Sequence, residues 1–285
     1  GGSNLSVKAR INTSVEIDQL LKKFKLLDIR NHYEKQIELA IKQDLSYRDF
    51  LMNLLKIEES GKKERLKERN IKAAHFENIK TLETFDFNFQ KNIKKQKIKE
   101  LETLAFLEKK ENIIFIGPPG VGKSHIAIAI GIRACEEGRK VLYITASELI
   151  ESLSKAYEQG KLKTKFKKLA RIDLLIIDEL GHFKMDKEKE SIFFQLIRQR
   201  YEKKSLIITT NLPLGKWDDI FTSRLAATAV LDRLVHHSHI ISIAGDSYRV
   251  KGKFKEAHGK SMNTFPSKIL DREFFKNAVA ALVLW

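Results

Sequence analysis

The most informative segment of the chain runs Gly117-Pro118-Pro119-Gly120-Val121-Gly122-Lys123-Ser124. It fills the pattern G-x-x-x-x-G-K-[ST], whose glycines let successive backbone N–H groups point at phosphate oxygens. An apolar run at residues 113–116 precedes it, and a helical pattern follows from about Lys123. This strand–loop–helix context predicts a nucleotide site, in which Lys123 binds the β- and γ-phosphates and the Ser124 hydroxyl binds Mg²⁺. The motif alone leaves ATP and GTP open.

Two carboxylates follow a second apolar run downstream. Residues 174–177 are Leu-Leu-Ile-Ile, and Asp178 and Glu179 come directly after them. We predict that Asp178 helps to hold Mg²⁺ and that Glu179 polarises the attacking water as a general base. A strand that merely ends in an acidic turn is the alternative, and the P-loop upstream disfavours it.

Further polar residues are candidates for the same site. Asn211 follows the apolar run at 206–209 and could orient the attacking water, although an Asn before Leu212-Pro213 could also serve only as a turn residue. Arg224 and Arg233 could neutralise the charge that develops on the γ-phosphate. Their spacing does not choose between them.

The order of the apolar runs predicts the fold class. Five short β-branched runs, at 113–116, 141–145, 174–177, 206–209 and 240–243, are separated by helical patterns. Such alternation is typical of βαβ units with a five-stranded parallel sheet, so we predict an α/β domain at residues 96–250. Apolar residues at helical spacing within residues 15–75 predict a small all-helical domain, with Ser46 and Asp49 as an N-cap pair.

The remaining segments have weaker patterns. Residues 76–95 predict a linker, whose alternating aromatic side chains at 84–89 suggest a short strand or a segment docked on the next domain. Residues 1–14 begin Gly-Gly-Ser and resemble a disordered expression tag, and residues 251–285 are expected to form a separate tail.

The net charge of +16 and the isoelectric point near 9.7 favour polyanionic partners. Lys161, Lys165 and Lys168 would share one helical face within an acid-free run, and Lys94 and Lys95 belong to a second such run. Lysine without a base-reading element predicts contacts to the phosphates of double-stranded DNA with little sequence discrimination. A solvated charged surface is the alternative for either run.

Other patterns bound the location and the metal chemistry. The sequence has no apolar run of the length that a membrane helix needs and no secretory signal, and its single cysteine, Cys135, excludes an intramolecular disulfide. We therefore expect a cytoplasmic protein without membrane contacts. His236, His237 and His239 could suggest zinc, but no cysteine or second ligand cluster lies nearby in the chain, so we predict ordinary packing or surface histidines.

Taken together, the residues resemble the AAA+ ATPases of the helicase-loader clade, and most closely the IstB-type ATP-binding proteins of insertion sequences. The resemblance covers about residues 20 to 250. Besides the P-loop, it is carried by these segments: Leu45-Ser46-Tyr47-Arg48-Asp49-Phe50-Leu51, Lys80-Thr81-Leu82-Glu83-Thr84-Phe85-Asp86-Phe87, Asp173-Leu174-Leu175-Ile176-Ile177-Asp178-Glu179-Leu180-Gly181, Arg200-Tyr201-Glu202, Leu231-Asp232-Arg233-Leu234-Val235-His236-His237 and Gly245-Asp246-Ser247-Tyr248-Arg249.

This resemblance implies a Mg²⁺-dependent ATPase that forms an ATP-dependent oligomer on double-stranded DNA and assists a transposase. It implies that the P-loop, continuing into His125, binds ATP, that Asn211 is sensor 1, and that Arg233 is the arginine finger reaching a neighbouring subunit. Arg249 would be a further sensor or a phosphate contact. A replicative helicase loader of the DnaC or DnaI type is the alternative function, and a nucleotide switch with little hydrolysis is another.

Overall fold

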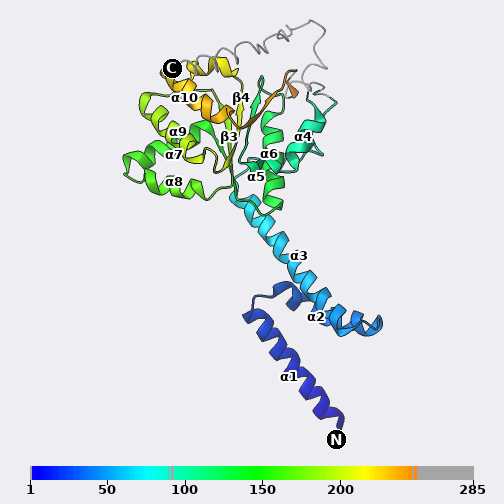
Figure 1. The fold of residues 1–285 in the computed structure, drawn as a ribbon. Helices are drawn as coiled ribbons and strands as arrows, with labels where there is room; N and C mark the ends of the chain where they lie inside the picture. Colours follow the sequence, from blue (N-terminus) through cyan, green and yellow to red (C-terminus); the bar gives the residue numbers. More distant parts are fainter. Residues whose placement is uncertain (1, 89, 91–92, 246, 249–285) are drawn as a thin grey trace, which may run out of the picture. The chain divides into compact units, whose positions relative to one another are not determined.

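The computed structural model describes residues 2–88, 90, 93–245 and 247–248 (Figure 1). Within it the chain forms two compact units. The first contains residues up to His75 together with Ala134–Lys140, and the second contains Phe76–Arg133 and the chain from Val141 onward. The predicted tail at 251–285 and Arg249 lie outside the described residues.

The first unit is helical. It contains α1 (Gly2–Lys23), α2 (Leu27–Lys42) and α3 (Tyr47–Ala73). The predicted cap is present, because the Ser46 hydroxyl accepts a hydrogen bond from the Asp49 N–H at 3.1 Å. The buried Glu58 carboxylate of α3 accepts the N–H groups of Asp28 and Ile29, which are unpaired donors at the start of α2. The expectation of disorder for residues 1–14 differs from the structure, in which α1 begins at Gly2.

The second unit contains the predicted five-stranded parallel sheet. Its strands are β1 (Asn112–Ile116), β2 (Val141–Thr145), β3 (Leu174–Leu180), β4 (Ser205–Thr210) and β5 (Ser238–Ser242). The order across the sheet is β2-β3-β4-β1-β5, and all four pairings are parallel. The interior strands are almost wholly buried, as expected for apolar runs covered on both faces.

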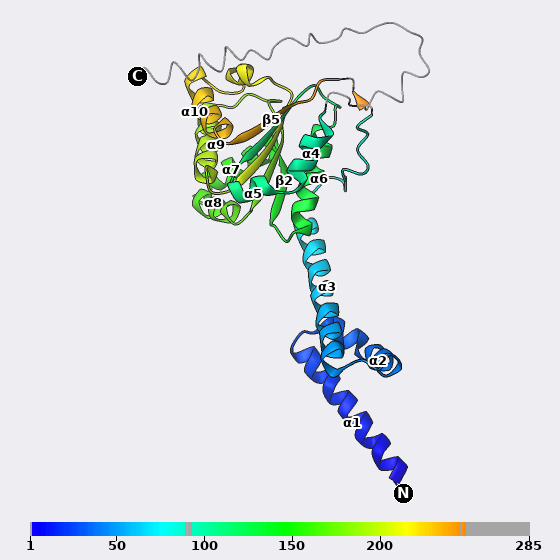
Figure 2. The same cartoon turned by 45° about the vertical axis from the view of Figure 1, so that its right-hand side comes forward.

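Helices cover both faces of the sheet, as the two views in Figures 1 and 2 show. The layer on one face contains α7 (Ala146–Glu158), α8 (Leu162–Ala170), α9 (Lys187–Arg200) and α10 (Arg224–Val235), and on the other face lie α4 (Lys95–Glu102) and α6 (Lys123–Glu136). Two short elements, α5 (Ala105–Lys109) and the 3₁₀ helix η1 (Leu214–Asp219), complete the unit. The main apolar core joins the sheet to α7, α9 and α10 through residues such as Ile177, Ile208, Leu153, Phe193 and Val230.

The carboxylates Asp178 and Glu179 lie near the end of β3, as predicted, and the strand continues to Leu180, where the pairing with β4 is irregular. The segment at residues 84–88 forms turns and no strand. It is docked, because the Phe85 side chain is buried. The docked alternative is therefore confirmed and the strand alternative is wrong.

Candidate nucleotide-binding site

A pocket lies at the carboxyl ends of the parallel strands, where α/β sheets usually bind ligands. Because β4 lies between β1 and β3, the loop after β1, the tip of β4 and the acidic end of β3 meet at one place. The pocket is lined by Lys80, Thr84, Phe85, Asp86, Gln90, Pro119, Gly120, Val121, Gly122, Lys123, Ser124, His125, Glu179, His182, Thr209, Thr210, Asn211 and Tyr248.

The loop between β1 and α6 has the backbone that its glycines predict. Gly120 and Gly122 have φ angles of +82° and +99°, which side chains rarely tolerate. A Cβ atom on Gly122 would also lie 2.5 Å from the Phe85 ring. Glycine is therefore required at position 122, where Phe85 packs closely against the loop. Successive N–H groups of such a loop and the α6 N-terminus can bind phosphate oxygens.

Lys123 and Ser124 begin α6 and face this loop. The Lys123 ammonium donates to the carbonyl oxygens of Gly117 and Pro118, both at 2.8 Å. Since an ammonium is a compact charge on a flexible stem, it can exchange these carbonyls for phosphate oxygens. The Ser124 hydroxyl donates to Asp178 Oδ1 at 2.9 Å, so the two side chains predicted to hold Mg²⁺ are in contact.

Asp178 is buried, and three hydroxyl groups hold it. Ser124 and Thr209 both donate to its Oδ1, and Tyr143 of β2 donates to its Oδ2 at 2.5 Å. Burial and the neighbouring carboxylate raise the pKa of Tyr143, so its phenol keeps the proton that it donates. The carboxylate is fixed in orientation and remains next to the Ser124 oxygen, an oxygen donor set that fits Mg²⁺.

Glu179 points to the cavity from an unusual backbone position. Its φ is +60°, a left-handed value for a non-glycine residue, and its N–H donates to the Thr209 hydroxyl at 3.0 Å. This geometry turns successive side chains of β3 in different directions, with Asp178 buried and Glu179 exposed on the pocket wall. A carboxylate at such a place can accept a proton from water.

Asn211 lies on the pocket wall at the tip of β4. Its amide oxygen is buried and has no hydrogen-bond partner among the described residues. A buried acceptor without a partner is costly, so a polar ligand or water in the pocket would satisfy it. The structure thus places Asn211 in the same pocket as the P-loop residues.

The chain before β1 forms one wall of the pocket. His125 Nε2 lies 2.8 Å from the carbonyl oxygen of Thr81, which can only accept, so Nε2 carries the hydrogen. The imidazole also packs edge-on against Phe85 at 5.1 Å. Burial, the largest cause, lowers the pKa of His125 and favours this neutral form. His125 therefore joins the P-loop helix to residues 81–85, which is a further task beside the predicted nucleotide contact.

The other predicted site residues lie away from the pocket wall. Arg233 on α10 donates to the Ala229 carbonyl at 2.8 Å and lies 4.8 Å from the Phe194 ring centre, whereas Arg224 is exposed. Neither arginine lines the pocket of its own chain. Lys161 and Lys168 are exposed at α8 and Lys165 is partly exposed, while Lys94 and Lys95 are exposed at the start of α4.

Sequence reasoning missed Tyr143 and Thr209. Both lie in apolar strands, Tyr143 in the middle of β2 and Thr209 next to the carboxyl end of β4, and only the position of Thr209 hints at a role. The contribution of Lys80, Asp86, Gln90 and Tyr248 to the pocket was also missed, because it depends on long-range chain placement.

The family comparison decides the relationship. The model of the IstB-like ATP binding protein family matches residues 19–256. The chain belongs to this family. It is 42% identical over 262 residues to the ATP-binding protein of insertion sequence IS21 from Pseudomonas aeruginosa, covering 92% of this chain and 98% of that protein. It is 37% identical to the ATP-binding protein of insertion sequence IS232 from Bacillus thuringiensis, covering 86% and 98%.

Among solved structures, the crystal structure of DnaI resembles this IstB-like protein with a TM-score of 0.50 at 17% identity, over 58% of this chain and 91% of that chain. This likeness concerns the fold alone, which is that of an AAA+ P-loop NTPase. Membership of this family of ATP-binding proteins favours ATP over GTP as the nucleotide. In the part of the chain that the structure describes, no helix combines the length and the apolar character needed to span a membrane.

Tyr143 provides a test of the site geometry. The change Tyr143→Phe keeps the ring and removes a hydrogen bond to a carboxylate, an interaction of about 1.5–3 kcal/mol. We expect the Mg²⁺ concentration for half-maximal binding of a fluorescent ATP analogue to rise about tenfold. Tyr157→Phe on α7, where the side chain is half exposed, is the control and should leave the Mg²⁺ dependence unchanged. Equal Mg²⁺ dependence in Tyr143→Phe and wild type would show that Tyr143 does not position Asp178.

Proposed function

We propose that this IstB-like protein hydrolyses ATP with Mg²⁺, assembles on double-stranded DNA in its ATP-bound form, and assists a transposase. The observation that carries the proposal is the joint placement of Ser124, Glu179 and Asn211 around one cavity, with the buried Asp178 hydrogen-bonded to Ser124. A pocket that only bound nucleotide would need the P-loop, but it would not need a carboxylate and an unpaired amide oxygen beside the γ-phosphate position.

In the proposed reaction, water attacks the γ-phosphorus and the bond to the β–γ bridging oxygen breaks, which yields ADP and phosphate. Glu179 accepts the proton of that water, and the Asn211 amide oxygen orients it. Lys123 moves from the carbonyls of Gly117 and Pro118 to the β- and γ-phosphates. Ser124 and Asp178 would hold Mg²⁺, which supplies positive charge to the phosphates when bound.

The positions of the arginines support a site that two subunits share. An arginine usually stabilises the transferring phosphoryl group, and neither Arg224 nor Arg233 lines the pocket of its own chain. In our proposal Arg233 reaches the ATP of a neighbouring subunit, with Arg224 as the alternative. Bound ATP would then hold neighbouring subunits together.

The charge distribution supports duplex DNA as the polyanion. The chain has 53 basic and 37 acidic residues, and α8 with its flanks presents several of the basic ones without an acidic neighbour in sequence. Lys161, Lys168 and Arg171 are exposed there. The absence of an acid within this run favours contacts with DNA phosphates, since internal ion pairs would neutralise it. The insertion-sequence relatives favour a transposase over a helicase as the partner.

DNA assembly is the first test. With a non-hydrolysable ATP analogue and a duplex of arbitrary sequence, mass photometry should show multi-subunit complexes that are absent with ADP. Changing Lys161, Lys165 and Lys168 to Glu should weaken DNA binding and lower the slope of log affinity against log salt by about 2 to 3. The matched control changes Lys184, Lys187 and Lys216 in the same way. No nucleotide-dependent assembly on DNA would refute the proposal.

Hydrolysis is tested at Glu179. Because a general base contributes about 10²- to 10⁴-fold, Glu179→Gln should lower kcat by at least about 100-fold and leave binding of the ATP analogue intact. Glu188→Gln, an exposed glutamate on α9, should behave as wild type. Wild-type turnover in Glu179→Gln would exclude the general-base role.

A mixing experiment tests the arginine. Arg233→Ala chains keep an intact pocket, whereas Glu179→Gln chains keep the arginine. If Arg233 acts across the subunit interface, each variant alone should be inactive and their mixture should regain part of the activity. If Arg224→Ala shows this behaviour and Arg233→Ala does not, the finger is Arg224.

A further inference from the structure

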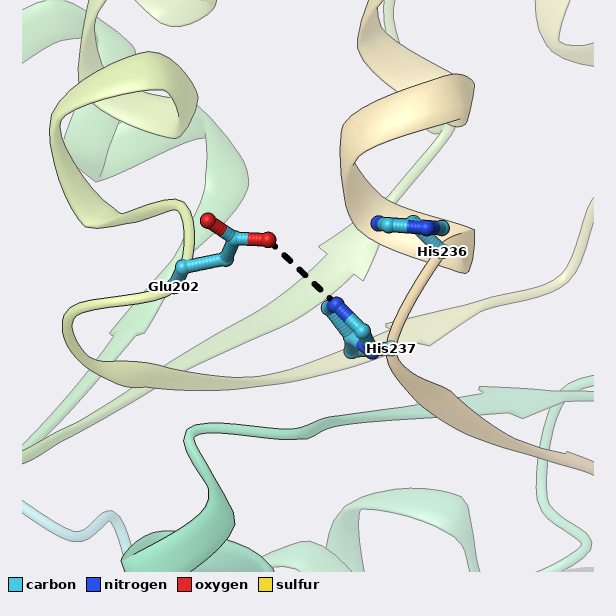
Figure 3. Close-up of side chains that lie close together, drawn as sticks. All are labelled: Glu202, His236 and His237. Carbon is cyan, nitrogen blue, oxygen red and sulfur yellow. Dashed lines mark ion pairs between the residues drawn. The ribbon is translucent and has the colours of Figure 1, made fainter.

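Three potential metal ligands meet at the amino ends of the parallel strands, whereas the nucleotide pocket lies at their carboxyl ends. Glu202 lies in the turn between α9 and β4, and His236 and His237 lie between α10 and β5. Both turns enter parallel strands at their amino ends, so they lie at the same end of the sheet although Glu202 and His236 are 34 positions apart in the chain. Figure 3 shows the carboxylate and the two imidazoles facing one another.

The distances bring the three ligand atoms within reach of one ion. One ligand atom from each residue lies within 4.8 Å of the others. A zinc ion with bonds of about 2.0–2.1 Å in tetrahedral geometry needs about 3.4 Å between ligand atoms. His237 Nε2 and Glu202 Oε1 are already 3.4 Å apart. All three side chains are exposed, so small rotations can close the remaining gaps.

The surroundings of His236 resemble the support that metal-bound histidines usually have. Its Nδ1 lies 2.7 Å from the Tyr201 hydroxyl, and the Tyr201 ring stacks on the imidazole with a centroid distance of 6.1 Å. The phenol oxygen can accept from Nδ1–H, and in that tautomer the Nε2 lone pair is left for a ligand. Tyr201 would then act on His236 as an accepting carboxylate or carbonyl does in many zinc sites.

We propose that Glu202, His236 and His237 bind one divalent transition-metal ion of the zinc class. Two imidazoles and one carboxylate match the ligand preference of Zn²⁺, and water would complete the coordination at this open surface. Sequence analysis predicted ordinary histidines because no further ligand lay nearby along the chain. Folding supplies Glu202 as that ligand.

The ion would connect two elements that matter for the nucleotide site. It joins the entrance of β4, whose far end leads to Asn211, to the end of α10, which carries Arg224 and Arg233. Binding to the folded chain alone stabilises it in proportion to metal concentration. The metal should therefore raise the melting temperature, while the pocket at the opposite end of the sheet keeps its nucleotide affinity.

The test uses the full chain without a histidine tag, treated with EDTA and dialysed. Zinc titration by calorimetry should show one ion per chain and a higher melting temperature, and Co²⁺ should give the visible absorption of a tetrahedral site. His237→Ala and Glu202→Gln should each weaken binding at least about tenfold. His239→Ala is the matched control, because His239 pairs with Glu111 at 3.0 Å outside the cluster.

Two results would overturn the proposal. One is the absence of saturable binding of Zn²⁺ or Co²⁺ by the wild-type chain. The other is binding that persists unchanged in both His237→Ala and Glu202→Gln, which would mean adventitious contact elsewhere. Binding of an ATP analogue by the metal-free chain, measured in parallel, reports on the nucleotide site independently.

Discussion

The position of β4 between β1 and β3 is the constraint on which the site depends. It inserts Thr209 and Asn211 between the P-loop and the acidic strand, and it leaves the Ser124 hydroxyl in contact with Asp178. Thr209 then binds both carboxylate residues, through the side chain of Asp178 and the N–H of Glu179. If β4 lay at the edge of the sheet, the P-loop strand β1 and the acidic strand β3 would be neighbours. Thr209 and Asn211 of the β4 end would then not lie between them.

The sequence predicted the sheet and the main pocket residues because both depend on local patterns. Buried parallel strands are short apolar runs, and a phosphate loop needs glycine at fixed places. Tyr143 could not be predicted, since its partner Asp178 lies 35 residues away on the neighbouring strand. Phe85 was expected to be docked somewhere, but its place against Gly122 depends on how the tertiary structure folds. Glu202 could not be predicted beside His236 and His237 for the same reason, because only folding brings it next to them.

ATP binding, subunit contact and DNA binding are linked in this account through a small set of charges. Lys123 has carbonyl partners that phosphate oxygens can replace, and the arginines of α10 lie away from the pocket of their own chain. In the proposed function a neighbouring chain completes the site, so bound ATP would stabilise the assembly and its loss would loosen it. An assembly of basic chains would multiply the phosphate contacts on DNA, which would make DNA binding sensitive to the nucleotide.

A crystal structure with Mg²⁺ and a non-hydrolysable ATP analogue tests the central claim most directly. The account predicts that the phosphates lie within the 117–124 loop and that Mg²⁺ lies about 2.1 Å from Ser124 Oγ. Ser124 binds the metal through an oxygen lone pair, so its O–H should still donate to Asp178, which Tyr143 and Thr209 also hold. Phosphates bound outside the loop, or Mg²⁺ bound away from the Ser124 oxygen, would contradict it.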